Sequence, residues 1–92
     1  MKINFYATLR PFVGQKTVEL PLAEGCTVQD VLDVIVETFP PLRKELLDEN
    51  GQLLSHVHLF INGRDAPYLE EMMATIIKAN DKIDVFPAVG GG

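Results

Sequence analysis

The sequence has a single cysteine and few basic side chains, and each shortage excludes a class of protein. Cys26 has no partner for a disulfide within the chain, and one thiol is too few for a Cys-based zinc site or an iron–sulfur cluster. A lone thiol fits the reducing cytoplasm, which is the location we expect. Lysine and arginine number 8 against 13 acidic residues, which gives a net charge of −5. This balance argues against nucleic acid and anionic membranes as partners and is compatible with a basic protein partner.

Long apolar runs are also missing. No run approaches the roughly 18 residues of a membrane span, and the N-terminus lacks the apolar stretch of a signal peptide. The chain has no Gly-x-x-x-x-Gly-Lys-Ser/Thr loop for nucleotide phosphates, so we expect no bound cofactor. With 92 residues, 47% of them hydrophobic, and without repeats or linkers, the chain is expected to form one small domain with its own core.

Alternating apolar and polar residues predict a hairpin at the start of the chain. Residues 2–8 and 16–20 each alternate with the period of a half-buried strand. A turn over residues 11–14 would join them. The inward-facing side chains are expected to be Ile3, Phe5, Ala7, Val18 and Leu20.

The pattern after Thr27 predicts the main helix. Apolar residues recur there at helical spacing and form one continuous stripe. They are Val28, Val31, Leu32, Ile35, Val36 and Phe39. Thr27 is a good N-cap, Asp30 completes a variant of the capping box, and Pro40-Pro41 stops the helix because proline lacks the N–H that the next turn needs.

The second half of the chain predicts more strands. They cover residues 57–61, 64–67 and 82–86, and Asn62-Gly63 favours a tight hairpin turn between the first two. A short helical turn is expected over residues 41–47, with Leu42 and Leu46 on one side.

Residues 68–79 fit either a helical turn or a loop, with Met72 and Met73 as core side chains. The apolar stripe of the main helix must cover one face of the sheet, so the order of elements predicts an α+β fold.

The sequence ends in Gly90-Gly91-Gly92. Glycine has no Cβ, so such a segment fits into a narrow slot of a partner, and its terminal carboxylate is unhindered. The alternative is a frayed tail without a function, because chain termini are often loosely ordered.

Four segments together resemble the MoaD/ThiS family of ubiquitin-like sulfur carriers. Residues 4–10 (NFYATLR) are similar to the family's first strand, and residues 24–28 (EGCTV) to its entry into the helix. Residues 60–65 (FINGRD) look like its Val-Asn-Gly hairpin, and residues 84–92 (DVFPAVGGG) like its phe-pro-pro-val-x-gly-gly ending. The resemblance covers essentially the whole chain. Gly90 departs from it, because the family usually has Ala or Ser there, and Ala79-Asn80-Asp81 replaces the family's Asp-Gly-Asp turn.

The resemblance implies a β-grasp fold, with a mixed four- to five-stranded sheet packed on one main helix. It implies a ubiquitin-like domain over residues 1–86 and a flexible reactive tail over residues 87–92. The chain would be a carrier rather than an enzyme. A ubiquitin-activating-like adenylyltransferase would use ATP to adenylate the carboxylate of Gly92, with Gly91 part of the same site. A sulfur donor would then convert the adenylate into a thiocarboxylate.

The sulfur would pass to an acceptor enzyme, and the resemblance points to the large subunit of molybdopterin synthase or an analogue. Transfer to cysteine, thiamine or tRNA thiolation, or attachment to lysines of other proteins, stays open. A different class of protein, a non-covalent β-grasp binding module, is the other alternative. A β-grasp ferredoxin is excluded by the lone cysteine.

Three aromatic residues are expected to form a partner-binding surface. Tyr6, Phe60 and Phe86 alternate with the inward residues of their strands. In a β-grasp sheet these strands are neighbours, so the rings would form one exposed patch, which is typical of a partner site. Val89 and Gly90 would extend this contact along the tail. Isolated exposed rings without a function are the alternative.

The remaining candidates are weaker. Cys26 precedes the predicted helix, where a thiolate is stabilised, but no histidine lies nearby in the sequence, so a structural role is favoured. His56 and His58 are two residues apart on a strand and are expected to face solvent. Two histidines alone make a poor metal site, and no metal is expected.

Overall fold

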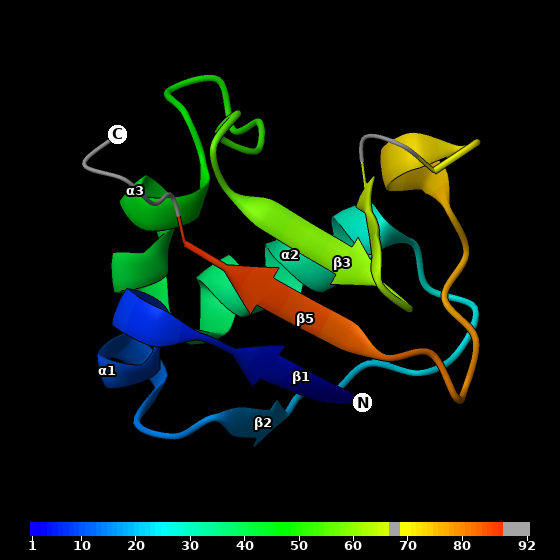
Figure 1. The fold of residues 1–92 in the computed structure, drawn as a ribbon, viewed down its shortest axis with the longest axis horizontal. Coiled ribbons are helices and arrows are strands. Elements are labelled where there is room, and N and C mark those ends of the chain that lie inside the picture. The colour runs from blue at the N-terminus through cyan, green and yellow to red at the C-terminus, as the bar shows by residue number, and fades with distance from the viewer. Residues whose placement is uncertain (67–68, 88–92) are drawn as a thin grey trace.

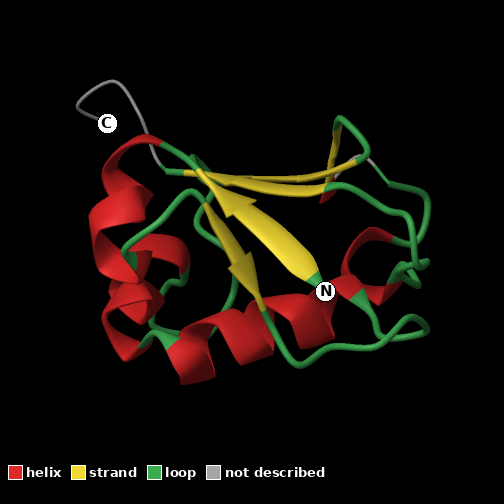
Figure 2. Cartoon of the chain, turned by 90° about the horizontal axis from the view of Figure 1, so that it is seen from below, coloured by secondary structure: helices red, strands yellow, loops and turns green. Residues whose placement is uncertain are grey.

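The helices of the protein lie on one side of its β-sheet. The computed structural model describes residues 1–66 and 69–87. Figure 2 shows the helices beneath and beside the sheet, and within the described residues the opposite face of the sheet carries no helix. We call this the open face. Helical segments among the described residues include η1 (Ala7–Leu9), α1 (Arg10–Val13), α2 (Val28–Thr38), η2 (Pro40–Leu42), α3 (Arg43–Leu46) and η4 (Met72–Ala74).

The sheet joins the two ends of the described chain. β1 (Lys2–Phe5) runs parallel to β5 (Ile83–Phe86), side by side at the centre of Figure 1. β2 (Thr17–Glu19) pairs antiparallel with β1. On the other side, β3 (His58–Ile61) pairs antiparallel with β5, and β4 (Arg64–Asp65) pairs antiparallel with β3. The resulting five-stranded order is β2-β1-β5-β3-β4. This mixed sheet on one main helix is the predicted β-grasp architecture.

The core lies between the sheet and α2. The inward residues of the strands meet the apolar stripe of the helix, whose buried members are Val28, Val31, Leu32 and Ile35. α2 begins at the predicted capping box: the Thr27 hydroxyl accepts from the Asp30 N–H at 3.1 Å, and the Asp30 carboxylate accepts from the Thr27 N–H at 2.9 Å. The predicted helical turn after α2 is also present as η2 and α3, with Leu42 and Leu46 fully buried.

The first predicted strand is too long. β1 ends at Phe5, and the chain then enters η1 and α1, so a helical segment rather than a simple turn joins β1 to β2. Ala7 has a φ of 52° and is exposed, where an inward position was expected; Leu9 is buried instead. The alternation of apolar residues continues in the sequence beyond β1, because Leu9 is also apolar and odd-numbered. Leu9 nevertheless reaches the core from a helical turn rather than from a strand.

The region before β5 was only partly predicted. Its described part contains η4, in which Met73 packs against the core. Met72 is 56% exposed, so its assignment to the core was wrong. Its φ of 47° belongs to the left-handed region, and this backbone conformation does not follow from the methionine side chain. The predicted hairpin turn is present, since Asn62 and Gly63 have φ values of 53° and 84°, as a type I′ turn requires.

Among the helices of residues 1–66 and 69–87, none is both long and apolar enough to cross a membrane.

Candidate functional site

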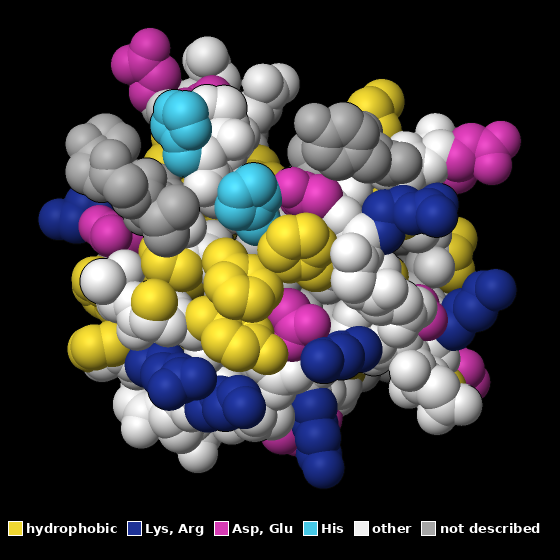
Figure 3. Space-filling view, in the orientation of Figure 1, with side chains coloured by type: hydrophobic (Ala, Val, Ile, Leu, Met, Phe, Trp, Pro, Cys, Tyr) yellow, Lys and Arg dark blue, Asp and Glu magenta, His cyan; other side chains and the backbone are white. Residues whose placement is uncertain are grey.

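The open face gathers Tyr6, Phe60 and Phe86 into one group of touching rings, which we call the aromatic cluster. Tyr6 stacks on Phe86 with centroids 4.2 Å apart and ring planes 8° from parallel. Phe60 meets Phe86 edge-on, at 5.4 Å and 85°. All three side chains are partly exposed rather than fully so. Figure 3 looks onto this face and shows the hydrophobic side chains at its centre.

Strand pairing explains why these rings meet. Ile83 and Val85 point into the core, so Asp84 and Phe86 point outward. The parallel register pairs Phe5 with Val85, which brings Tyr6 to the side of Phe86. The antiparallel register of β3 pairs Phe60 with Asp84, one step along the same face. The cluster therefore depends on three strands that are far apart in the sequence.

A mostly buried carboxylate lies beside the aromatic cluster on the same face of the sheet. Asp84 is 7% exposed and accepts hydrogen bonds from the Tyr6 hydroxyl at 3.0 Å and from the Asn4 amide at 2.9 Å. The Thr17 hydroxyl donates in turn to Asn4 at 2.7 Å. Burial and the Asp84 carboxylate raise the pKa of the Tyr6 phenol. A phenol is protonated at neutral pH in any case, and the raised pKa extends to higher pH the range in which Tyr6 donates its hydrogen bond to Asp84.

His58 extends the aromatic cluster toward β4. Its ring stacks on Phe60 at 5.6 Å and 18°, and its Nδ1 lies 2.6 Å from the Asp65 carboxylate. His58 lies on the solvent-facing side of β3, as expected, and its side chain is 42% exposed, with the Asp65 carboxylate and the Phe60 ring covering the rest. His56 is exposed, as expected, but it precedes β3, so the two histidines do not share a strand face.

Basic side chains border the aromatic cluster. The Arg10 guanidinium lies 5.7 Å from the centroid of the Tyr6 ring, and the Lys16 ammonium lies 5.8 Å from it. The Lys82 ammonium is 3.8 Å from the Asp84 carboxylate. Sequence reasoning missed these residues and Asp84. Strand alternation alone would have placed Asp84 on the face of Phe86, whereas the positions of Arg10 and Lys16 depend on α1.

The reactive tail expected from the sequence begins next to the aromatic cluster. Phe86 is the last residue of β5, and Pro87, which follows it, is buried. Val89, Gly90, Gly91 and Gly92 lie outside the described residues, as does the predicted flexibility of the tail. A partner that takes hold of the chain after Pro87 would meet the aromatic cluster at once.

Cys26 is not part of this site. It is partly buried at the start of α2, and its carbonyl accepts a hydrogen bond from the Ile77 N–H at 2.7 Å. Burial, with a smaller contribution from the negative charge of Asp30, raises the pKa of the Cys26 thiol. A thiol with a raised pKa is a poor nucleophile at neutral pH, which agrees with a structural role.

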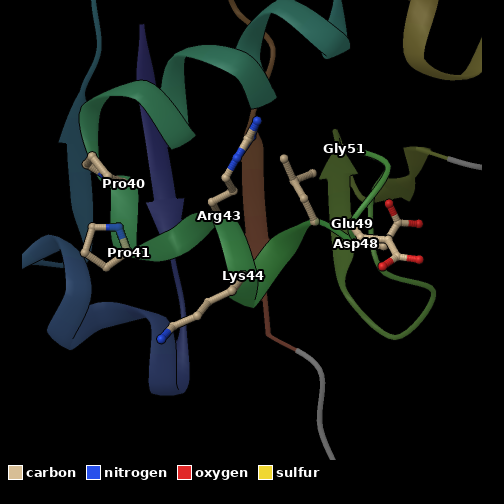
Figure 4. A pocket seen from close by; sticks show the side chains of 8 residues that line it. Pro40, Pro41, Arg43, Lys44, Asp48, Glu49 and Gly51 are labelled. Carbon is tan, nitrogen blue, oxygen red and sulfur yellow. The ribbon is translucent and has the colours of Figure 1, made fainter.

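A groove beside α3 gathers charges without bringing them to one point. Figure 4 shows Arg43 and Lys44 pointing away from each other, with Asp48 and Glu49 on the opposite wall. Groups that diverge in this way do not form a binding centre for a small ligand. No three or more His, Cys, Asp or Glu side chains gather as metal ligands in the part of the chain that the structure describes.

Comparisons with known proteins identify the family. The ThiS family model matches residues 3–92. Small archaeal modifier protein 3 of Haloferax volcanii is 36% identical over 92 residues, which is 100% of this chain and 98% of the relative. Sulfur carrier protein CysO of Mycobacterium tuberculosis is 29% identical over 98% of this chain and 96% of its own length.

The crystal structure of SAMP1 from Haloferax volcanii is similar with a TM-score of 0.82 and 28% identity, covering 99% of this chain and 97% of that one. The names of the two sequence relatives describe a small modifier protein and a sulfur carrier protein rather than a catalyst. With a family match from residue 3 to residue 92, a β-grasp sheet and a glycine-rich ending, the chain belongs to the ThiS family of ubiquitin-like sulfur carrier and modifier proteins.

Proposed function

We propose that the protein carries sulfur on its C-terminal glycine. A ubiquitin-activating-like adenylyltransferase binds the domain, adenylates the carboxylate of Gly92 and exchanges the adenylate for sulfur. The observation that carries the proposal is the aromatic cluster directly beside the residue at which the chain leaves β5. This arrangement lets one partner bind the folded domain and the glycine-rich ending together. The family match through residue 92 supports the same reading.

The chemistry needs an outside catalyst. A terminal carboxylate, with an ordinary pKa of about 3.3–3.7, is ionised at neutral pH and is a poor electrophile. Attack of a carboxylate oxygen on the α-phosphorus of ATP releases pyrophosphate and leaves an acyl adenylate. A sulfide nucleophile then adds to the carbonyl and AMP departs, which leaves a thiocarboxylate. One difficult step is thereby split into two easier ones.

The tail is long enough to reach an enclosed active site. Residues 87–92, if extended at about 3.3 Å each, span roughly 20 Å. The three glycines present no side chains to the walls of a narrow channel. The adenylyltransferase supplies the nucleotide site, since the chain has no phosphate-binding loop.

For the acceptor we propose the large subunit of molybdopterin synthase or an analogue. The similarity of residues 84–92 to the ending of the MoaD/ThiS carriers supports this choice. Carriers for cysteine, thiamine or tRNA thiolation share the same ending, so the acceptor is to be identified by co-purification from host extract.

The second candidate function is a covalent modifier of protein lysines. It is favoured by the 36% identity with a protein named small archaeal modifier protein 3. The last basic residue of the chain is Lys82, so trypsin would leave residues 83–92 attached to any modified lysine. Mass spectrometry of digested host protein distinguishes this remnant from free carrier. A non-covalent binding module would give neither the remnant nor a thiocarboxylate.

The decisive experiment compares the full chain with a chain lacking Gly91-Gly92. Incubated with ATP, a sulfide source and the host's adenylyltransferase, the full chain should gain the mass of one oxygen replaced by sulfur. The truncated chain should stay unchanged and should not support ATP–pyrophosphate exchange. Gly90→Ala is the matched control and should remain active, because the family usually has Ala or Ser there. Equal exchange with the truncated chain would rule out Gly92 as the acyl group.

A further inference from the structure

The charge next to the aromatic cluster is opposite in sign to the charge of the whole chain. The net charge of −5 favours a basic partner. Two exposed cations, however, lie within 6 Å of the Tyr6 ring centroid, Arg10 at 5.7 Å and Lys16 at 5.8 Å, and Lys82 lies beside the mostly buried Asp84. Figure 3 shows dark blue side chains along one border of the hydrophobic group. We call Arg10, Lys16 and Lys82 the basic rim.

The acidic residues of the open face are less available to a partner than the basic rim. The side chain of Asp84 is 9% exposed and holds two internal hydrogen bonds, whereas that of Lys82 is 66% exposed. The Asp65 side chain is 13% exposed and pairs with His58. Glu19, at the β2 edge, is exposed but pairs with the N-terminal ammonium. A protein approaching the rings therefore meets exposed positive charge first.

The backbone holds the basic rim in place. The Phe5 N–H donates to the Lys16 carbonyl at 2.7 Å, which ties the segment before β2 to the end of β1. The Arg10 Nε donates to the Phe5 carbonyl at 3.1 Å. Gly14, with a φ of 83°, ends α1 and turns the chain back toward β2. These contacts place both cations within cation–π range of the Tyr6 ring.

We propose that the protein partner which covers the aromatic cluster presents an apolar socket bordered by Asp and Glu side chains. These carboxylates pair with Lys16, Arg10 and Lys82 while the socket buries the rings. The inference rests on the proposed function only in taking the adenylyltransferase as the partner to be tested. Charges at the border of an interface mainly set the association rate and its salt dependence, so the acidic border acts by steering the encounter.

The experiment measures association of the full chain with the host's adenylyltransferase by stopped-flow fluorescence at low and at physiological salt. Lys16→Glu is compared with Lys78→Glu, which makes the same change of charge at an exposed residue outside the basic rim, in the segment between η4 and β5. We expect Lys16→Glu to slow association roughly tenfold at low salt, and Lys78→Glu less than about twofold. The difference should shrink with added salt, since the screening length falls from about 30 Å at 0.01 M to about 8 Å at 0.15 M.

A neutral variant and a variant at a second position of the basic rim test whether slower association is due to charge rather than to misfolding. Lys16→Gln should give a smaller slowing of the same sign, and Lys82→Gln should also slow association; thermal melts show whether each variant is folded. Faster association of Lys16→Glu, or equal effects of Lys16→Glu and Lys78→Glu, would overturn the inference, because then the partner is basic or only net charge matters.

The inference and the proposed function fail in different ways. If the wild-type chain binds with the expected charge dependence but supports no ATP–pyrophosphate exchange, the proposed function is wrong and the inference stands. If exchange is normal but association is insensitive to Lys16, the inference is wrong and the function stands. Absence of any binding by the wild-type chain would overturn both.

Discussion

Phe86 occupies the central position in the aromatic cluster, because both Tyr6 and Phe60 contact its ring. Its neighbour in sequence, Val85, is almost fully buried in the core. One residue thus anchors β5 while the next presents a ring to the outside. Such a ring, already held by two others, loses little freedom when a partner covers it, which is the property of a strong interface anchor.

Replacing Phe86 or Phe60 by Ala should weaken binding to the adenylyltransferase by roughly tenfold or more, since buried aromatic anchors often contribute about 2 kcal/mol or more each. Stability should fall by only about 1 kcal/mol, the size of an aromatic pair contribution. Leu32→Ala, in the core, is the contrast and should cost about 2–5 kcal/mol. Titration calorimetry and urea unfolding give the two quantities. Large destabilisation with normal affinity would show that the rings serve the fold.

The raised pKa of Cys26 leads to a prediction about its reactivity. At a pH near 8, a smaller fraction of the thiol is ionised than in a free cysteine peptide, so iodoacetamide should alkylate the folded chain more slowly. The pH at which the rate reaches half of its maximum should lie above the ordinary thiol value. Intact mass against time gives the rate, and the urea-unfolded chain is the control. Faster alkylation in the folded chain would indicate an activated thiol and reopen a catalytic role.

Among the elements, α2 depends on the side chains of its N-cap, Thr27, and of Asp30 in its first turn. Thr27 and Asp30 exchange two hydrogen bonds and so satisfy N–H groups that have no partner within the helix. The helix carries no basic residue in its last turn, so nothing there compensates for the loss of the cap.

Thr27→Ala should lower the free energy of unfolding by about 1 kcal/mol, the usual contribution of an N-cap. Thr27→Ser keeps the hydroxyl and should lose much less. The comparison separates the hydrogen bond from the packing of the threonine methyl group, and urea unfolding measures both variants. Equal losses for the Ala and Ser variants would mean that the methyl group, rather than the cap, stabilises this end of the helix.

At the level of the domain, stability should be highest where the two ends of the chain meet. β1 and β5 each have strand neighbours on both sides, and Ile3 and Ile83, paired across them, are fully buried. β4 contains two residues and, within residues 1–66 and 69–87, pairs with β3 alone. The sheet therefore has a strong centre and weak edges, and its centre forms only when residues about 80 positions apart come together.

Amide hydrogen exchange followed by NMR should show this gradient. Amides that bond between β1, β5 and β3 should exchange only through global unfolding, and those that join β4 to β3 or β2 to β1 through smaller local openings. The unpaired outer amides of the edge strands serve as the internal control. Protection in β4 equal to that in β5 would show that the hairpin and the centre of the sheet open as one unit.

Local patterns were enough to predict most elements. The apolar stripe of α2, its capping box, the Asn62-Gly63 turn and the later strands all depend on residues within a few positions of one another. Prediction was wrong at Ala7 and Met72, where the backbone adopts a left-handed conformation that neither side chain favours. The surrounding contacts, rather than local preference, hold the chain there.

Sequence alone therefore established the α+β class, the outward placement of Tyr6, Phe60 and Phe86 and the glycine-rich ending, because strand and helix periods are local properties. The resemblance to β-grasp carriers predicted that the three rings would be neighbours. Only the packed structure determined that Asp84 is mostly buried beside these rings and that Arg10 and Lys16 lie next to Tyr6. The burial of a side chain and its distance from charged groups both depend on segments that are far apart in the sequence. The parallel register of β1 with β5 brings those segments together.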